Sequence, residues 1–139
     1  MNILFDTNII LSAILPTNSN HVQAAKLMGL ATTDLIYGHL TASSVTDIYY
    51  IARKRLGDGP TRMAIQDLLD TLLVVPVDGE DCQNALSSLM KDFEDALVAA
   101  CAAKARIDYI VTEDQGFLAE TTTAAPVIST AGLLALLAG

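Results

Sequence analysis

Short apolar segments alternate with longer segments of helical character along this chain, and this alternation limits the fold more than any other feature. Mostly apolar runs occur at residues 1–5, 73–77, 109–112 and 126–129. Strands that alternate with helices of ten or more residues form βαβ units, in which parallel strands carry helices on both faces of the sheet. The sequence therefore predicts an α/β fold built on a parallel sheet.

The spacing of apolar residues and the positions of glycine and proline set the expected helices. These helices cover residues 9–15, 21–30, 45–56, 61–72, 80–90, 92–105 and 131–137. Ser43 and Ser44 are good N-terminal caps for the third helix, and Gly57 is a common C-terminal stop. A loop is expected at residues 57–60, and residues 35–40 fit either a helix or a strand.

The amount of apolar sequence is sufficient for one hydrophobic core. Of the 139 residues, 52% are apolar and 17% are charged, which excludes intrinsic disorder for most of the chain. We expect a single domain over residues 1–139.

The longest uninterrupted apolar run, residues 96–103, is far shorter than the roughly 20 residues that cross a bilayer. Asp6 also interrupts any signal-peptide segment, so we expect a cytoplasmic protein with no membrane partner.

The net charge argues mildly against a nucleic-acid partner. Sixteen acidic residues face eight basic ones, for a formal charge of −8, so the surface as a whole repels phosphate. Half of the basic residues lie close together, as Arg53, Lys54, Arg55 and Arg62. This cluster is either a solvated helix end or a local contact for a phosphate backbone, and the sequence leaves both interpretations open.

Several other classes of site are excluded or disfavoured. The chain has no glycine-rich phosphate loop and no Gly-x-Ser-x-Gly motif. Residues 6–8 resemble the start of a haloacid-dehalogenase-like phosphatase motif, but Asn8 stands where that motif has a second Asp. Cys82 and Cys101 lack partners at zinc-ligand spacing, so we expect two buried free thiols.

Two acids come directly after apolar strands. Asp6 follows the run that ends at Phe5, and Asp114 follows the run that ends at Thr112. Polar residues beyond the carboxyl ends of parallel strands form the site of such sheets. Convergent carboxylates are tolerated together only if a cation neutralises them, and Mg²⁺ prefers oxygen ligands. The pattern therefore predicts a metal site, with a turn-forming role as the alternative for each Asp.

Two further acids have a structural and a functional interpretation. If Asp92 caps the helix that follows, Asp95 lies in its first turn, where an acid is ordinary helix chemistry or a metal ligand. Asp47 lies three residues after Ser44, which fits a capping box as well as a site residue. Spacing alone leaves both pairs of alternatives open.

Four segments together resemble the PIN domain, a metal-dependent nuclease fold that includes the VapC-like toxins of bacterial toxin–antitoxin pairs. They are residues 5–8 (FDTN), 44–50 (SVTDIYY), 92–97 (DFEDAL) and 112–117 (TEDQGF), and they occur in the family's order over nearly the whole chain. The resemblance implies a doubly wound parallel sheet flanked by helices, with acids at its centre.

The resemblance also implies which residues bind metal. Asp6 and Asp95 would be the principal ligands of Mg²⁺ or Mn²⁺, and Asp114 and Asp47 would complete a set of acids that is both metal-binding and catalytic. Relatives usually carry Glu at the position of Asp47. Because Asp is shorter by one methylene, Asp47 could reach a metal through water.

Polar neighbours of these acids are implied as well. Asn8 and Thr112 match positions that support the ligands through hydrogen bonds, and Asp92 is a further acid beside them. Many relatives also have a basic residue at Glu113 and an acid near Gly116, so the attraction of a polyanionic substrate is weaker here.

The expected function is that of an Mg²⁺- or Mn²⁺-dependent endoribonuclease that hydrolyses RNA phosphodiester bonds, as the toxin of a type II toxin–antitoxin pair. Its partners would be RNA, an antitoxin protein and a second copy in a homodimer. The apolar helices expected at residues 21–30 and 61–72 could form the dimer surface or a groove for an antitoxin peptide. The alternative is a PIN-like binding module with weak or no catalysis that acts through a protein partner.

Overall fold

The computed structural model describes all residues 1–139, which fold as strands that alternate with helices. The elements in chain order are β1 (Asn2–Phe5), α1 (Thr7–Ile14), α2 (His21–Leu30), β2 (Tyr37–Thr41), α3 (Ala42–Leu56), α4 (Asp58–Thr71), β3 (Leu73–Val75), α5 (Gly79–Leu86), α6 (Phe93–Lys104), β4 (Tyr109–Val111), α7 (Gln115–Leu118), β5 (Val127–Ile128) and α8 (Thr130–Ala138). None of the helices is long and apolar enough to span a bilayer.

The five strands form one sheet in the order β3-β2-β1-β4-β5, and every neighbouring pair is parallel. The chain builds outward from β1 through β2 to β3, then returns to the other side of β1 with β4 and β5. The strand order therefore switches direction between β1 and β4. In open parallel sheets, this switch point is where the carboxyl ends of the strands leave a crevice.

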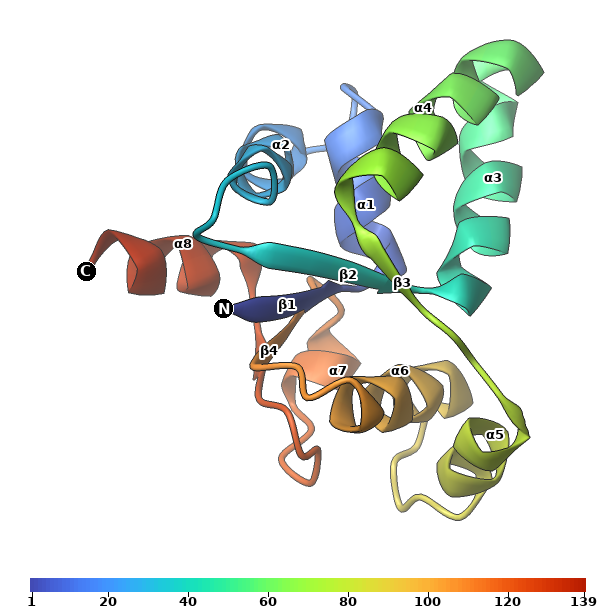
Figure 1. Cartoon of the computed structure of the whole chain (residues 1–139), viewed down its shortest axis with the longest axis vertical. Coiled ribbons are helices and arrows are strands. Elements are labelled where there is room, and N and C mark those ends of the chain that lie inside the picture. Colours follow the sequence, from blue (N-terminus) through green and yellow to red (C-terminus); the bar gives the residue numbers. More distant parts are fainter.

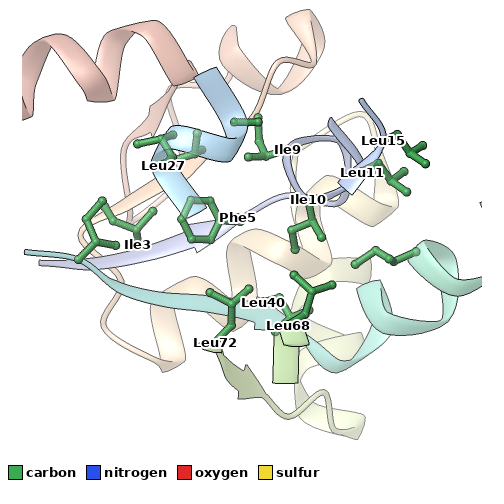
Figure 2. Close-up of a cluster of buried hydrophobic side chains, with 14 of the residues drawn as sticks. Ile3, Phe5, Ile9, Ile10, Leu11, Leu15, Leu27, Leu40, Leu68 and Leu72 are labelled. Atoms are coloured by element: carbon green, nitrogen blue, oxygen red, sulfur yellow. The ribbon is translucent and has the colours of Figure 1, made fainter. Parts of the chain in front are cut away.

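Helices cover both faces of the sheet, so the predicted α/β fold with a doubly wound sheet is confirmed. Helices α1 to α4 lie on one face and α5 to α7 on the other (Figure 1). Strand β1 separates the two cores because successive side chains point to opposite faces. Ile3 and Phe5 pack beneath α1 and α2, as Figure 2 shows, and Leu4 packs with Ile110 on the α6 side.

The ambiguous segment at residues 35–40 forms most of strand β2, which runs from Tyr37 to Thr41. Gly38 permits this strand to pass close to its neighbours, because a Cβ added there would lie 2.5 Å from Cδ2 of Leu72 and 2.9 Å from Cε2 of Phe5. A larger residue would therefore displace α4 or β1. Gly38 therefore allows the C-terminal end of α4 to pack closely against the centre of the sheet.

The loop expected at residues 57–60 is wrong. Asp58, Gly59 and Pro60 form the first turn of α4, and only Gly57 separates this helix from α3. A proline fits a first turn because the N–H it lacks would have no partner there. Gly57 makes the sharp junction with a φ of 82°, a conformation that favours glycine. The short helix α7 was not expected at all.

The expectation of two buried thiols is half wrong. Both cysteines are free, but Cys101 of α6 is buried whereas Cys82 of α5 is exposed. Burial raises the pKa of the Cys101 thiol to about 11. Cys101 therefore behaves as a small apolar core residue at neutral pH.

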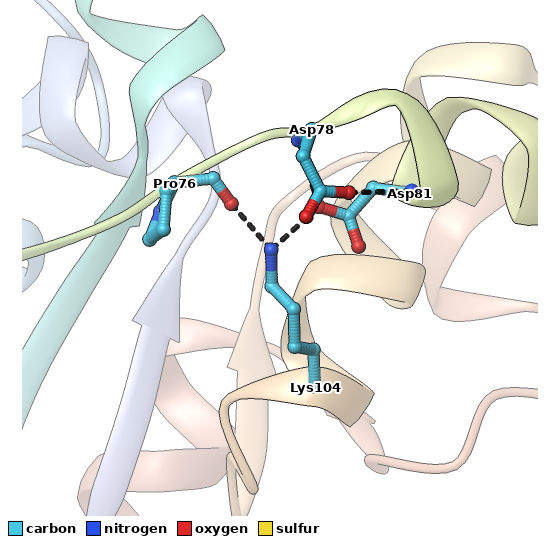
Figure 3. A network of polar contacts seen from close by, with 4 residues as sticks. All are labelled: Pro76, Asp78, Asp81 and Lys104. Carbon is cyan, nitrogen blue, oxygen red and sulfur yellow. Dashed lines mark hydrogen bonds and ion pairs between the residues drawn. The ribbon is translucent and has the colours of Figure 1, made fainter.

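An ion pair ties the start of α5 to the end of α6 (Figure 3). Nζ of Lys104 donates to Oδ2 of Asp81 at 2.5 Å and to the carbonyl oxygen of Pro76 at 2.7 Å. Asp81 and Asp78 also form a reciprocal capping box at the start of α5. The Lys104 hydrogen bond lowers the pKa of Asp81, and the Asp81 carboxylate raises the pKa of Lys104. Lys104 therefore compensates the charge of Asp81.

Candidate active site

An acidic pocket opens at the carboxyl ends of β1 and β4, where the strand order switches. Its volume is about 760 Å³, and its walls come from α1 and α3 on one side of the sheet and from α6 on the other. No lysine, arginine or histidine lines it. The carboxylates that line it are Asp6, Asp47, Asp92, Glu94, Asp95 and Asp114.

Asp6 accepts more hydrogen bonds than any other acid of this pocket. It is the N-cap of α1, and its Oδ1 accepts a hydrogen bond from the Thr7 amide at 2.9 Å. Its Oδ2 accepts from Nδ2 of Asn8 at 3.1 Å and from Oγ1 of Thr112 at 2.8 Å. Burial nevertheless raises its pKa, with a further contribution from the charge of Asp114. The carboxylate is held firmly without a cation beside it.

Asn8 and Thr112 connect the two strands at the switch point. Nδ2 of Asn8 also donates to Oγ1 of Thr112 at 3.0 Å, and Oδ1 of Asn8 accepts from the Glu113 amide at 3.0 Å. Oγ1 of the fully buried Thr112 accepts in addition from the Asp114 amide at 3.1 Å. These two side chains therefore fix Asp6, after β1, relative to the backbone of Asp114, after β4.

Asp95 has the most strongly raised pKa of the acids in the pocket. Burial and the charges of Asp92, Asp6, Asp114 and Glu94 raise its pKa to about 7. The helix-cap role falls to Asp92, whose Oδ1 accepts from the Asp95 amide at 3.0 Å. The Asp95 carboxylate itself accepts no hydrogen bond. Helix capping is thus excluded as the role of Asp95.

Asp114 has a structural role at the same time as it faces the pocket. It is the N-cap of α7, where its Oδ2 accepts from the Phe117 amide at 2.8 Å. The turn-forming alternative expected for this residue therefore describes part of what it does. One carboxylate oxygen remains without a hydrogen bond.

The capping box that was one of the two interpretations of Asp47 does not form. Helix α3 begins at Ala42, and its N-cap is Thr41, whose Oγ1 accepts from the Ser44 amide at 3.3 Å. Asp47 therefore lies in the second turn, exposed, on the side of α3 that lines the pocket. It has no capping role there.

The chemistry of these donors fits a hard divalent cation. All the charged ligand atoms are carboxylate oxygens. The pKa values of Asp6 and Asp95 are raised first by burial and then by the neighbouring carboxylates, and a bound cation would oppose both effects. In the structure as it stands, no three of the acids lie close enough to hold one ion together. Side-chain rotation at exposed Asp47 and half-buried Asp95 would have to bring oxygens inward.

Several lining residues were not expected from the sequence. Glu94 adds an acid beside Asp95, and Phe93 and Ile51 add exposed apolar surface. The sequence shows no pattern that predicts a role for these residues, because only the packing of α3 and α6 brings them to the pocket. Glu113 turns away: its Oε1 accepts from the Thr130 amide at 2.8 Å, at the start of α8.

Fold and site together define an α/β domain with an acidic pocket at the switch point of its sheet. A comparison of the sequence with family models leads to the same class. The family model described as the PIN domain matches residues 2–116. The chain belongs to the PIN domain family. No protein among curated sequences matches it significantly.

Solved structures similar in fold include toxins of toxin–antitoxin systems. VapC20 of Mycobacterium tuberculosis, described as a sarcin–ricin loop cleaving toxin, has a TM-score of 0.69 at 18% identity, over 83% of this chain and 92% of that chain. DNA-bound VapBC of Salmonella typhimurium has a TM-score of 0.68 at 13% identity, over 94% and 98%. A Klebsiella pneumoniae toxin–antitoxin complex has a TM-score of 0.66 at 19% identity, over 91% and 96%. The TM-scores establish a shared fold, and at identities this low the similarity shows the fold alone.

Proposed function

We propose that this chain is an Mg²⁺- or Mn²⁺-dependent endoribonuclease that hydrolyses RNA phosphodiester bonds. The observation that carries the proposal is the Asp95 carboxylate, which lies without a hydrogen bond among four other acids and has a pKa of about 7. A fold that maintains such a charge cluster stores electrostatic repulsion, which a bound cation would relieve. Membership of the PIN family and the similarity to VapC20 support the same assignment.

The proposed roles follow from the hydrogen bonds. Asp6 and Asp95 are the principal ligands, with Asp114 and Asp47 as the remaining acids. A divalent ion bound to them would lower the pKa of a water molecule and offset charge on the leaving oxygen. Asn8 and Thr112 hold the Asp6 carboxylate in one orientation through bonds of 3.1 and 2.8 Å. No protein nucleophile is required.

The direct test is cleavage of a mixed single-stranded RNA by the purified protein in Mn²⁺. Cleavage should disappear with EDTA and in Asp95→Asn, and it should persist in Asp34→Asn, which changes an exposed acid outside the pocket. Persistence of cleavage in Asp95→Asn would overturn the assignment of that residue. Absence of cleavage by folded wild-type protein, free of partner, would favour the alternative below.

The alternative is a PIN-like binding module that has little or no catalytic activity and acts through a protein partner. The observation that favours it is that no three acids lie within reach of one ion, with the shorter Asp at position 47. Thermal melting with and without Mn²⁺ separates the two functions. A melting temperature that Mn²⁺ leaves unchanged would favour the binding module.

We further propose that the chain is the toxin of a type II toxin–antitoxin pair, and that its antitoxin binds an apolar groove. A groove of about 450 Å³ runs between α1, α2 and α4. Its apolar lining includes Ile14, Met28, Ala64 and Leu68. An amphipathic antitoxin helix is the proposed occupant, since such helices place apolar anchors in grooves of this kind. The expected homodimer stays a prediction, and size-exclusion chromatography would test it.

Matched substitutions on one turn of α4 test the groove. Ala64 lines it, whereas the neighbouring Met63 is 73% exposed and lies outside. If a small neighbouring gene encodes the antitoxin, co-expression should relieve growth arrest by the wild type and by Met63→Arg, but not by Ala64→Arg. Equal relief of both variants would place the antitoxin elsewhere.

A further inference from the structure

Two exposed apolar side chains lie on the walls of the acidic pocket. Phe93 is 48% exposed and Ile51 is 45% exposed, and both line the pocket. Ile51 belongs to α3 on one face of the sheet, and Phe93 belongs to α6 on the other face (Figure 1). An aromatic ring and a branched aliphatic chain therefore approach the same space from two layers of the fold.

Both residues are fixed beside proposed metal ligands. Phe93 is the first residue of α6, between its N-cap Asp92 and Asp95. Ile51 lies four residues after Asp47, so the two share one face of α3. Any group held by Phe93 and Ile51 is thus adjacent to the phosphate that the acids would position.

The charge of the pocket makes such contacts necessary for substrate binding. Every charged group in the lining is a carboxylate, so no side chain there attracts phosphate directly. A polyanion could enter only with bound cations, and these neutralise rather than select. Uncharged parts of the substrate must then supply affinity and register.

We propose that Phe93 and Ile51 bind one unpaired base of a single-stranded RNA, next to the phosphate to be cleaved. The proposal rests on the ribonuclease function proposed above and assigns the contact with a base to these two side chains. A base is a flat, largely apolar ring that stacks on an aromatic side chain and packs against an aliphatic one. Because every base has such a face, the contact favours single strands over duplexes without fixing the sequence.

The test pairs a change in the protein with a change in the RNA. Binding of a short labelled single-stranded RNA is measured in Mn²⁺ by fluorescence anisotropy, and RNA integrity is checked on a gel. One abasic nucleotide is placed at each position in turn. In the wild type, one abasic position should weaken binding about tenfold, and Phe93→Ala should weaken binding of the intact RNA by about the same factor.

The decisive result is the combination of the two changes. The abasic position should cost Phe93→Ala no further affinity, because the two changes remove the same contact. Phe93→Tyr should retain binding, since it keeps the ring, and Ile51→Ala should lose less than Phe93→Ala. Leu89→Ala is the matched control, because Leu89 is 94% exposed just before α6 and lies outside the pocket.

The outcomes separate this inference from the ribonuclease proposal. Unchanged binding by Phe93→Ala, or an abasic penalty that is the same in both proteins, would overturn the base contact even if RNA is cleaved. Loss of antitoxin binding alone in Phe93→Ala would overturn it too, by assigning the ring to a protein surface. Base-dependent binding without cleavage would instead overturn the nuclease function and leave the contact standing.

Discussion

Helices α5 and α6 begin with the same pattern of acids but use it in opposite ways. Each has an Asp as N-cap and a second Asp three residues later, as Asp78 and Asp81 in α5 and as Asp92 and Asp95 in α6. In α5 the carboxylate of the second Asp accepts hydrogen bonds from Lys104 and from the Asp78 amide, and its pKa is lowered. In α6 it has no partner, and its pKa is raised to about 7.

The difference lies in what the tertiary structure brings to each helix start. The end of α6 supplies Lys104 to α5, whereas β1 and β4 bring Asp6 and Asp114 towards the start of α6. One pair of acids stabilises the fold, and the other makes it less stable in the absence of a cation. Clustered acids indicate a functional site only where no cation of the protein compensates them.

The largest expected effect is on cleavage. Asp6→Asn and Asp95→Asn should lower the rate of RNA cleavage at least about a hundredfold, because each removes a principal ligand. Asp81→Asn should leave the rate within about twofold when assayed below its melting temperature. The measurement is initial cleavage rate in Mn²⁺. A rate that falls equally in all three variants would show that the two acid pairs do not differ in function.

The next effect is on stability, and it should have the opposite distribution. Asp81→Asn should lower the free energy of unfolding by about 2 kcal/mol, because it removes a charged hydrogen bond that joins α5 to α6. Lys104→Met should also lower stability, and the double variant should cost less than the sum of the two single changes. Urea unfolding measures all three. Additive losses would mean that the two side chains act independently.

The pH dependence of stability tests the raised pKa of Asp95. In EDTA, its carboxyl binds a proton more tightly in the folded state than in the unfolded state. Its contribution is therefore complete below the usual pKa of 3.8 and is lost as the pH rises through about 7. Wild-type protein in EDTA should lose stability between about pH 4 and about pH 7, and Asp95→Asn should lose less.

Asp81 should show the opposite pH dependence of stability, which makes it the comparison for this experiment. Its pKa is lowered, so its contribution is present above the usual value of 3.8 and is lost as the pH falls through the folded value. Asp81→Asn should therefore weaken resistance to acid, while the loss of stability linked to Asp95, as the pH rises towards about 7, should stay at about wild-type size. Added Mn²⁺ should reverse the neutral-pH loss in wild type alone, not in Asp95→Asn.

The sequence predicted those parts of the molecule that depend on local pattern. Asp6 and Asp114 could be assigned to the ends of β1 and β4 because apolar strands that end in polar residues are visible in one dimension. The start of α3 was misplaced because Ser43 and Ser44 are as good N-caps by residue type as Thr41, which caps the helix in the structure. Helix α7 was missed because four residues are too few to show a helical period.

The role of each acid pair could not be predicted from its own sequence. Asp81 and Lys104 are 23 residues apart, and nothing near Asp81 marks its partner. In the sequence, Phe93 likewise resembles an ordinary helix residue. Only the packing of α3 and α6 brings Phe93 and Ile51 to the same pocket. Compensation of charge and the lining of a pocket are properties of packing between elements.

The smallest expected effect compares the two N-caps by the same substitution. Asn caps a helix about as well as Asp, so Asp78→Asn and Asp92→Asn both keep the cap and remove one charge. At α5 the lost charge attracted Lys104, so stability should fall by about 0.3 kcal/mol. At α6 the lost charge repelled Asp95, so stability in EDTA should rise by about the same amount. Thermal melting of the two variants in EDTA measures the sign directly. Changes of the same sign would mean that Lys104 does not distinguish the two helix starts, because then only the cap, and not the compensation of charge, would decide stability.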